Sequence, residues 1–362
     1  MTFERAIADL ITRLYPGREL AKVEPLAPDT GATAGASTKV AGYGKPVRIV
    51  LASRTEPPLE LVWRVTSANE FGHDRRADRA AVTLQAYDDF ARMPRHVAPV
   101  DIGVIDGEGR MHSIRDGGEL YLVTTYAAGS VYADDLRRVA DTGIAEPRDL
   151  ARIDALAAYL AELHRPVTNA EVRYRRAIRD LVGSGEGIYG IVDGYPPDVP
   201  GAAPQRLRAL EEECASWRWK LRDAARRVTR THGDFHPFNI VFAEDHELTL
   251  LDASRGGCGD PADDVTALAV NFVLFALGRP AAWSRGLGVL WRRWWTEVAA
   301  RRPDPELRLV CPPFFAWRAL VVANPRFYPN LAGGERDRLL GLAERFLEDA
   351  YVDPAAAEEL FA

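Results

Sequence analysis

Apolar positions near the N-terminus follow the spacing of one helix face, and those that come next have the character of strands. The helical set is followed directly by Pro16-Gly17 and consists of Phe3, Ala6, Ile7, Leu10, Ile11 and Leu14. It predicts an opening helix that ends before the proline. The runs at 38–42, 46–52 and 59–65 predict a small antiparallel sheet.

The rest of the chain is dominated by helical spacing. Leucine, isoleucine and alanine recur on one face from Asp149 to His164, and Gln205–Arg227 forms a second long candidate helix. Between the two parts, Glu119–Gly129 predicts a buried strand that enters a glycine turn. We therefore expect an N-terminal unit of residues 1–126 and a mostly helical C-terminal unit of residues 127–362.

Length and composition predict a two-part globular protein. The 362 residues exceed one ordinary core, and 47% apolar with 27% charged residues is typical of a soluble chain rather than a disordered one. The net charge of −6 comes without a basic stripe, so we expect no nucleic-acid partner. Oligomeric state is left open.

The N-terminus and the cysteines predict a cytoplasmic protein. Glu4, Arg5 and Asp9 interrupt the first apolar pattern, which argues against a secretory signal. No apolar run approaches the length of a membrane span, so we expect no membrane partner. The three cysteines are scattered and predict neither a disulfide framework nor a metal site; they are Cys214, Cys258 and Cys311.

The strongest chemical pattern lies in Thr231–Asp252, THGDFHPFNIVFAEDHELTLLD. Asn239 opens an apolar run, and 247–252 resembles a returning strand after a polar turn. Such a hairpin would bring Asn239 and Asp252 together. Asp234 precedes it on a loop interrupted by Pro237, where a backbone without regular pairing can direct a side chain into a cleft.

These residue types fit phosphoryl transfer. That reaction needs positioning and charge neutralisation more than covalent chemistry from the protein. A carboxylate that faces the attacking hydroxyl makes Asp234 the candidate base. An amide oxygen and a carboxylate are hard ligands suited to Mg²⁺, so Asn239 and Asp252 are the candidate metal ligands.

His232-Gly233-Asp234, an Asn five residues after the Asp and a strand that ends in Asp resemble the signature of the aminoglycoside phosphotransferase and choline kinase superfamily. The resemblance implies an α/β (α+β) two-lobed protein-kinase-like fold, with an antiparallel sheet plus helix in the N-lobe and a mostly helical C-lobe. It implies the same roles for Asp234, Asn239 and Asp252, with Mg²⁺ as cofactor and ATP or GTP as phosphate donor. Gly259–Asp264 is similar to the family's Gly-Asp-Pro segment, where we expect Asp260 to cap a helix.

The resemblance also implies a nucleotide site in the N-terminal part. The turn from Gly31 through Gly35 to Ser37 stands at the nucleotide loop, where glycine lets backbone amides approach phosphate. Main-chain groups of Thr124, Thr125 and Tyr126, at the place of the interlobe hinge, would hold the purine. Neither set of residues distinguishes ATP from GTP.

Two positions depart from the family's usual residues. Arg64 stands where a Lys, or sometimes an Arg, contacts the α- and β-phosphates, and arginine differs from lysine in shape and reach. Lys39 and Lys45 are alternatives. Asp78 stands where a Glu usually orients this cation, so Arg64 and Asp78 are the expected pair. Two alternatives are that Arg64 pairs with Asp74 or that both acids are exposed to solvent.

A zinc site is the competing interpretation of the motif. On an extended strand, His232, Asp234 and His236 would point to one side and could bind zinc. This alternative explains neither Asn239 nor Asp252, and the other five histidines form no second cluster.

The C-terminal part is rich in aromatic residues, which at helical spacing predict core, with one or two left to line an acceptor pocket. They are Trp283, Trp291, Trp294, Trp295, Phe314, Phe315, Trp317, Phe327 and Tyr328. The span 283–328 holds eight arginines against three acids, which disfavours a polycationic aminoglycoside as acceptor. Acids elsewhere, such as Asp134, Asp135, Asp263 and 211–213, keep that class open.

We therefore expect a phosphotransferase that acts on a hydroxyl of a small molecule, with an antibiotic or related metabolite as the favoured acceptor and resistance by O-phosphorylation as the role. A primary-metabolism kinase for a sugar, an amino alcohol or a hydroxy amino acid is the first alternative. A non-catalytic nucleotide-binding regulator on the same fold is the second. Arg64 and Asp78 motivate the regulator, whereas the intact Asp234, Asn239 and Asp252 argue against it.

Overall fold

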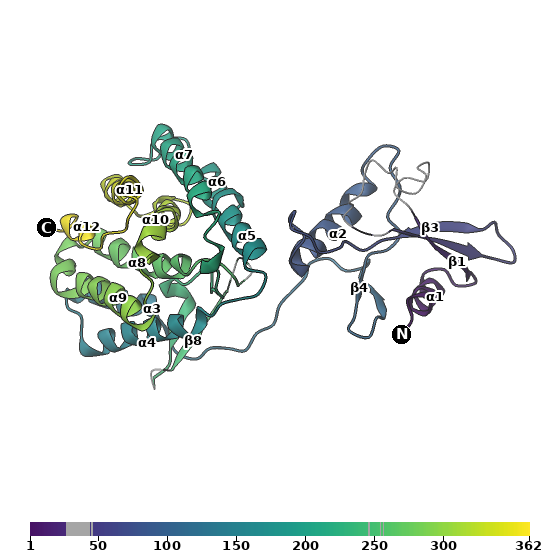
Figure 1. The fold of residues 1–362 in the computed structure, drawn as a ribbon, viewed down its shortest axis with the longest axis horizontal. Coiled ribbons are helices and arrows are strands. Elements are labelled where there is room, and N and C mark those ends of the chain that lie inside the picture. The colour runs from purple at the N-terminus through teal and green to yellow at the C-terminus, as the bar shows by residue number, and fades with distance from the viewer. Residues whose placement is uncertain (27–43, 45, 245–246, 254, 256) are drawn as a thin grey trace. The chain divides into compact units, whose positions relative to one another are not determined.

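The computed structural model describes residues 1–26, 44, 46–244, 247–253, 255 and 257–362. The chain forms two compact units, Met1–Thr124 and Thr125–Ala362, which are described separately (Figure 1). The predicted nucleotide turn, with Gly31, Gly35 and Ser37, lies outside the described residues. So do the alternative cations Lys39 and Lys45 and the predicted strand at 38–42.

The first unit contains the predicted helix and antiparallel sheet. Helix α1 spans Phe3–Leu14, and strands β1 (Glu19–Pro25), β2 (Val47–Ala52) and β3 (Leu59–Trp63) pair in the order β1-β2-β3. One face of α1 is buried together with Ile49, Leu51 and Met111. The sequence pattern missed β1, in which charged residues alternate irregularly with apolar ones and the register shifts between Leu20 and Lys22.

Helix α2 (Arg76–Phe90) and the hairpin of β4 (Gly103–Ile105) with β5 (Met111–Ser113) complete this unit. The buried strand expected at 119–129 is wrong. That segment contains no strand, and Tyr121 and Tyr126 are 91% and 89% exposed. Strand-forming residues need a paired neighbour and a core face. Here the apolar run leads to the boundary of the two units and has no strand partner among the described residues.

The second unit is mostly helical, as predicted. Its small sheet has the order β6-β7-β8, from β6 (Ser130–Val131), β7 (Ile240–Phe242) and β8 (Leu248–Leu250). The helices before β7 are α3 (Tyr132–Thr142), α4 (Pro147–Leu163), α5 (Ala170–Gly183), α6 (Ile188–Asp193) and α7 (Pro204–Leu221). Those after β8 are α8 (Pro261–Leu277), α9 (Gly288–Arg301), α10 (Leu307–Ala323), α11 (Gly333–Glu348) and α12 (Ala356–Glu359). The long helices expected at 149–164 and 205–227 are confirmed as α4 and α7, although α7 ends at Leu221.

Helices α8 and α10 form the centre of this unit, with α9 and α11 around them (Figure 1). Both central helices are buried on nearly all sides, which fits their continuous apolar sequence. The prediction that most C-terminal aromatic residues are core is confirmed. The buried ones are Trp283, Trp291, Trp294, Trp295, Phe314, Phe315 and Trp317, while Phe327 is exposed.

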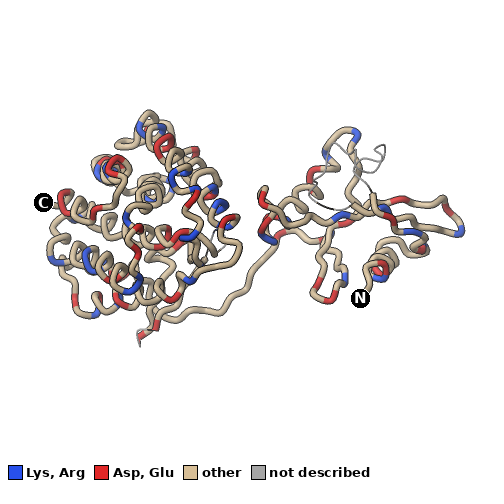
Figure 2. Tube along the Cα trace, viewed as in Figure 1, with Lys and Arg blue, Asp and Glu red and all other residues tan. Residues whose placement is uncertain are grey.

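Charged residues of both signs are interspersed along the helices of the second unit (Figure 2). In the part of the chain that the structure describes, no helix combines the length and the apolar character needed to cross a bilayer. Some charged residues of this unit are buried. Among them, Asp260 and Asp264 near the start of α8 and Arg318 in α10 lie beside the predicted motif.

Candidate active site

The predicted hairpin is confirmed as β7 and β8, which pair antiparallel with Ile240 opposite Leu250. The backbone N–H of Leu251 donates to the Asn239 carbonyl at 2.9 Å and so extends the pairing by one step. Asn239 and Asp252 consequently lie at the same end of the hairpin. Asp252 is exposed and has a φ of 49°, a left-handed conformation that ends the strand.

Both carboxylate oxygens of Asp234 have donors. Arg318 Nη1 donates to Oδ1 at 2.9 Å, and Asn239 Nδ2 donates to Oδ2 at 3.1 Å. The His236 ring Nε2 lies 3.2 Å from Oδ2. Asn239 Nδ2 also donates to the Asp234 carbonyl, so the candidate metal ligand and the candidate base support each other.

Arg318 comes from the middle of α10 and was not singled out by the sequence argument. Its Nη2 donates to the Gly233 carbonyl at 2.9 Å and to Asp263 Oδ1 at 2.8 Å, while its guanidinium lies 4.0 Å from the Trp317 ring centroid. The side chain is buried. The signal that points to it is a single charged residue within the apolar run 310–323, because an isolated cation is buried only where partners stabilise it.

The electrostatic surroundings keep Asp234 ionised. Burial alone raises its pKa, but hydrogen bonding and charge from His236 and Arg318 more than offset this and hold the pKa below its usual range. A carboxylate of low pKa is a weak acceptor of protons. In phosphoryl transfer the low proton affinity of Asp234 matters little before the transition state, because its main task is to position the attacking hydroxyl.

Asp264 fixes the backbone of the loop that carries Asp234. The N–H groups of His232 and Gly233 donate to its two carboxylate oxygens at 2.9 and 2.8 Å, and His164 Nε2 lies 3.0 Å from Oδ2. Burial by itself raises the pKa of Asp264, and the hydrogen bond from His164 together with the two backbone donors lowers it below its usual value. His232 Nδ1 accepts from the Asp234 N–H at 3.3 Å, so the ring of His232 supports the backbone of this loop.

The predicted cap at Asp260 is confirmed, since its side chain accepts from the Ala262 N–H at 3.0 Å at the start of α8. The same buried carboxylate receives Arg227 Nε and Nη2 at 2.8 and 3.0 Å and the Tyr174 hydroxyl at 2.9 Å. Arg227 continues to Asp304 at 2.9 Å. This network ties the start of α8 to α5 and to the loop before α10.

The contacts of the motif do not fit zinc. His232 accepts a backbone hydrogen bond, and His236 Nδ1 accepts from the Phe238 N–H at 3.2 Å. Over the described ranges, no group of three or more His, Cys, Asp or Glu residues is arranged to hold a metal ion. The amide and carboxylate at the hairpin end are a different donor set. Because Asn239 commits its Nδ2 to Asp234, its Oδ1 is left for another partner, and hard oxygen ligands fit Mg²⁺.

The predicted nucleotide residues occupy separate places in the chain. Arg64 follows β3, and its guanidinium lies 4.9 Å from the Phe90 ring centroid. Asp78, in the first turn of α2, accepts from the Arg75 N–H at 2.9 Å as part of a capping box. The hinge set of Thr124, Thr125 and Tyr126 is exposed and spans the boundary between the two units.

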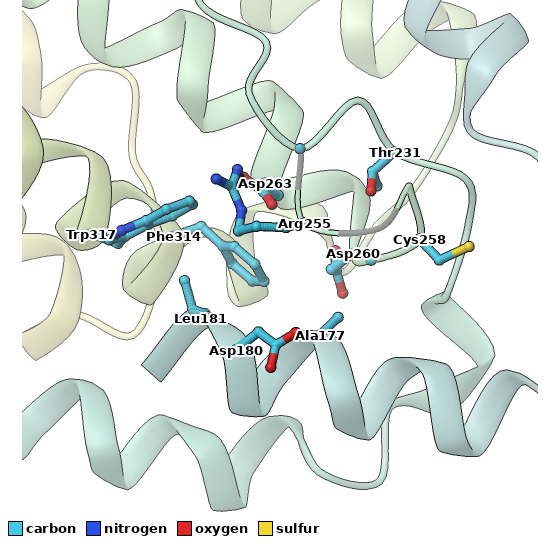
Figure 3. Close-up of a pocket in the computed structure, with 12 residues that line it drawn as sticks. Ala177, Asp180, Leu181, Thr231, Arg255, Cys258, Asp260, Asp263, Phe314 and Trp317 are labelled. Carbon is cyan, nitrogen blue, oxygen red and sulfur yellow. Dashed lines mark ion pairs between the residues drawn. The ribbon is translucent and has the colours of Figure 1, made fainter. Parts of the chain in front are cut away.

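A small cavity of about 20 Å³ lies beside the Asp234 loop (Figure 3). Phe314 and Trp317 line it from α10, and Ala177, Asp180 and Leu181 line it from α5. The loop between β8 and α8 contributes Arg255, Cys258 and Gly259, and the start of α8 contributes Asp260 and Asp263. Thr231 and Gly233 complete the lining.

Part of the chain is similar to known proteins. Residues 62–300 match the family model described as the phosphotransferase enzyme family. An aminoglycoside 3'-phosphotransferase from Salmonella typhimurium is 28% identical over 158 residues, which are 43% of this chain and 54% of that protein. The match therefore spans about half the length of the curated relative.

Two solved structures overlap with most of the chain at low similarity. A choline kinase from Streptococcus pneumoniae has 12% identity and a TM-score of 0.34, covering 96% of this chain and 99% of that one. A glucosamine kinase in complex with glucosamine, ADP and inorganic phosphate has 13% identity and a TM-score of 0.39, with 96% and 99% covered. Similarity at this level carries no argument about the acceptor.

Proposed function

The chain belongs to the phosphotransferase enzyme family, and on that premise we propose that it transfers the γ-phosphoryl group of ATP or GTP to a hydroxyl of a small molecule. The observation that carries the proposal is the set of contacts at Asp234. One of its oxygens is held by Arg318 and the other by Asn239, at the hairpin end that also carries Asp252. This combination supplies a fixed carboxylate next to two further oxygen ligands.

In the proposed reaction, the acceptor hydroxyl oxygen attacks the γ-phosphorus. A bond forms between that oxygen and phosphorus as the bond from phosphorus to the bridging oxygen of the nucleotide breaks. The electron pair of the broken bond leaves with the nucleoside diphosphate, and the hydroxyl proton passes to the Asp234 carboxylate. The transition state for such a transfer is loose, so orientation of the hydroxyl contributes more than its early deprotonation.

Asp234 orients that hydroxyl, and its neighbours keep Asp234 in place. Arg318 binds both the Asp234 side chain and the Gly233 carbonyl, which prevents rotation of the carboxylate relative to its own backbone. Asp264 holds the same loop from the other side through two N–H groups. Positioning of this kind is worth large factors in rate, because a misplacement of about 1 Å can cost about 100-fold.

Asn239 Oδ1 and the Asp252 carboxylate would hold Mg²⁺ at the end of the hairpin. When bound there, the ion neutralises charge on the phosphate oxygens and helps to align them. The exposed carboxylate of Asp252 and the free amide oxygen of Asn239 are a donor set that suits this ion.

Residues of the first unit would complete the nucleotide site. We assign Arg64 to the α- and β-phosphates, Asp78 to its orientation, and main-chain groups of 124–126 to the purine, as the family resemblance implies. The turn of 31–37 would cover the phosphates. These assignments support ATP and GTP equally.

For the acceptor, the curated relative named as an aminoglycoside 3'-phosphotransferase favours an antibiotic or related metabolite, with resistance by O-phosphorylation. The arginines of 283–328 favour an acceptor other than a polycation, which suits a primary-metabolism kinase or a different antibiotic class. A nucleotide-binding regulator would have no chemical use for the contacts at Asp234. We further propose a cytoplasmic location, because the three cysteines are free thiols, which suits a reducing compartment.

Mass spectrometry of phosphate transfer tests the proposal. The protein is incubated with Mg²⁺ and either ATP or GTP, across aminoglycosides, macrolides, other hydroxylated antibiotics, sugars, amino alcohols and hydroxy acids. We expect one acceptor class to gain one phosphate and Asp234→Asn to abolish the gain. Asp198→Asn, the same substitution at an exposed site of the second unit, is the matched control. Nucleotide binding without transfer to any acceptor would support the regulator instead.

A further inference from the structure

Two guanidinium groups lie against one aromatic ring beside Asp234. Arg255 Cζ is 4.3 Å and Arg318 Cζ is 4.0 Å from the Trp317 ring centroid. In the close-up, Arg255 stands between Trp317 and the carboxylates at the start of α8 (Figure 3). Arg318 donates a hydrogen bond to Asp234, whereas Nε and Nη2 of Arg255 donate none to the described residues.

Arg255 presents an unused pair of donors. Its Nε and Nη2 are buried and have no hydrogen-bond acceptor within the described parts of the chain. Asp263 Oδ1 lies 3.6 Å from Nη2, beyond hydrogen-bond distance, and that oxygen already accepts from Arg318 at 2.8 Å. A buried donor without a partner costs free energy, so a ligand that satisfies it gains that free energy on binding.

The two free donors share one edge of the guanidinium plane. Nε–H and Nη2–H point in the same direction and match the spacing of the two oxygens of a carboxylate. This bidentate geometry separates arginine from lysine and selects planar oxyanions. The guanidinium lies over the Trp317 ring, 4.3 Å from its centroid, and this cation–π contact favours its position in the cavity.

The other carboxylates of the cavity are already neutralised. Asp260 is bound by Arg227 at 2.8 and 3.0 Å, and Asp180 is bound by Arg176 at 2.8 Å. Asp263 faces both Arg318 and Arg255, and burial raises its pKa. Arg255 therefore shares one carboxylate, that of Asp263, with Arg318, and its Nε and Nη2 donors remain without a hydrogen-bond acceptor among the described residues.

We propose that Arg255 and Trp317 bind a carboxylate group of the acceptor and thereby place its hydroxyl at Asp234. The cavity volume of about 20 Å³ is room for about one water molecule, so it suits a terminal group rather than a whole substrate. The remainder of the acceptor extends toward Asp234, whose neighbour Gly233 lines the same cavity. The inference rests on the proposed function and narrows its acceptor to a hydroxylated carboxylic acid.

Calorimetric titration tests this assignment. The protein is first saturated with Mg²⁺ and a non-hydrolysable analogue of ATP or GTP, whichever binds, so that added anions find the γ-phosphate position filled. It is then titrated with two matched pairs, glycerate with glycerol and gluconate with glucitol, and separately with glucosamine and with inorganic phosphate. We expect the carboxylate member of at least one pair to bind about tenfold or more tightly than its alcohol, because a site with unpaired donors discriminates strongly against a ligand that lacks the acceptor.

Arg255→Met is expected to remove this advantage, and Arg255→Lys to restore part of it, because lysine keeps the charge but not the two-donor edge. Unchanged affinity for the nucleotide analogue shows that the Arg255→Met protein is folded. Equal binding of each acid and its alcohol, binding of inorganic phosphate alone, or an advantage that survives Arg255→Met would overturn the proposal.

The transfer assay separates the two proposals. Phosphorylation of glycerol, glucitol or glucosamine in preference to the acids would leave the phosphotransferase function standing and refute the carboxylate site. Arg255-dependent binding of an acid without transfer to it or to any other acceptor would support the site and contradict the phosphotransferase function.

Discussion

Arg318 Nη1 donates to Asp234 Oδ1 at 2.9 Å, although the two residues are 84 positions apart. Arg318 comes from the apolar helix α10, and Asp234 from the loop before β7. The contact places a buried guanidinium behind the proposed base, where it both orients the carboxylate and favours its ionised form. We regard Arg318 as a positioning residue, because it acts through Asp234.

Removal of this guanidinium is expected to change the pH dependence of transfer. In Arg318→Met, burial remains while one stabilising charge is lost, so the pKa of Asp234 rises. The acid limb of the pH–rate profile then moves to higher pH, and kcat at neutral pH falls by about 10- to 100-fold. Arg318→Lys, which keeps the charge, should show a smaller displacement. A lower kcat with an unmoved acid limb would mean that Arg318 has only a structural role.

Asp264 is expected to be a major contributor to stability. Asp264→Ala leaves two buried N–H groups and His164 without their acceptor, which we expect to cost about 3–5 kcal/mol in the free energy of unfolding. Denaturant titration measures this loss. The matched Asp198→Ala change at an exposed site should cost less than about 0.5 kcal/mol. A loss below about 1 kcal/mol at Asp264 would contradict the anchoring role.

The same carboxylate predicts a pH dependence of stability. The folded pKa of Asp264 is depressed, so its contribution is fully present above the unfolded pKa of about 3.9 and is lost as the pH falls through the lower folded value. The difference in unfolding free energy between the parent protein and Asp264→Asn should therefore shrink only below about pH 4. A difference that shrinks already near pH 6 would assign the effect to another group.

The network at the start of α8 predicts a graded pattern of stability loss. Arg227→Met leaves Asp260 buried without its cation and should cost about 3–5 kcal/mol. Tyr174→Phe removes one hydrogen bond to the same carboxylate and should cost about 1 kcal/mol. Thermal or denaturant unfolding of both variants measures the order. Equal losses would show that the ion pair does not dominate the network.

Substitutions at the hairpin end are expected to change the magnesium requirement. Asp252→Asn and Asn239→Ala each remove one proposed oxygen ligand and should raise the Mg²⁺ concentration for half-maximal transfer by about tenfold or more. A titration of transfer rate against Mg²⁺ measures this. Asn239→Ala should also lower kcat at saturating Mg²⁺, because Asn239 donates to Asp234. An unchanged requirement in both variants would exclude these residues as ligands.

Local patterns predicted the elements whose packing follows their own periodicity. Helix α1 and the β7–β8 hairpin lie where the apolar spacing placed them. The cap at Asp260 was predicted as well, because a side-chain oxygen followed by proline is a local signal for a helix start. The aromatic core followed from the large area that such side chains bury.

The errors arose where pairing between distant segments decides the outcome. The apolar run at 119–129 has strand composition but gains no strand partner among the described residues, and its side chains are exposed. Strand β1 has a weak pattern and forms because β2 pairs with it along its length. Composition alone does not report either relationship.

The candidate site was predicted only in part for the same reason. The motif identifies Asp234, Asn239 and Asp252 by spacing along the chain. Arg318 and Arg255 become visible only when α10 and the loop after β8 are folded against that motif. For Arg318, the one available signal was a lone cation within an apolar helix. For Arg255, nothing in the neighbouring sequence indicated that its side chain would pack against Trp317.

The central claim is that Asp234 orients the acceptor hydroxyl and accepts its proton during transfer of a phosphoryl group. Single-turnover kinetics tests this claim most directly. The rate of phosphate appearance on the acceptor is measured for the parent protein, Asp234→Asn and the Asp198→Asn control, at saturating Mg²⁺ and nucleotide. The account predicts a rate reduced by about 100-fold or more in Asp234→Asn, with nucleotide affinity retained and the control unaffected. Transfer by Asp234→Asn at the parental rate would contradict it.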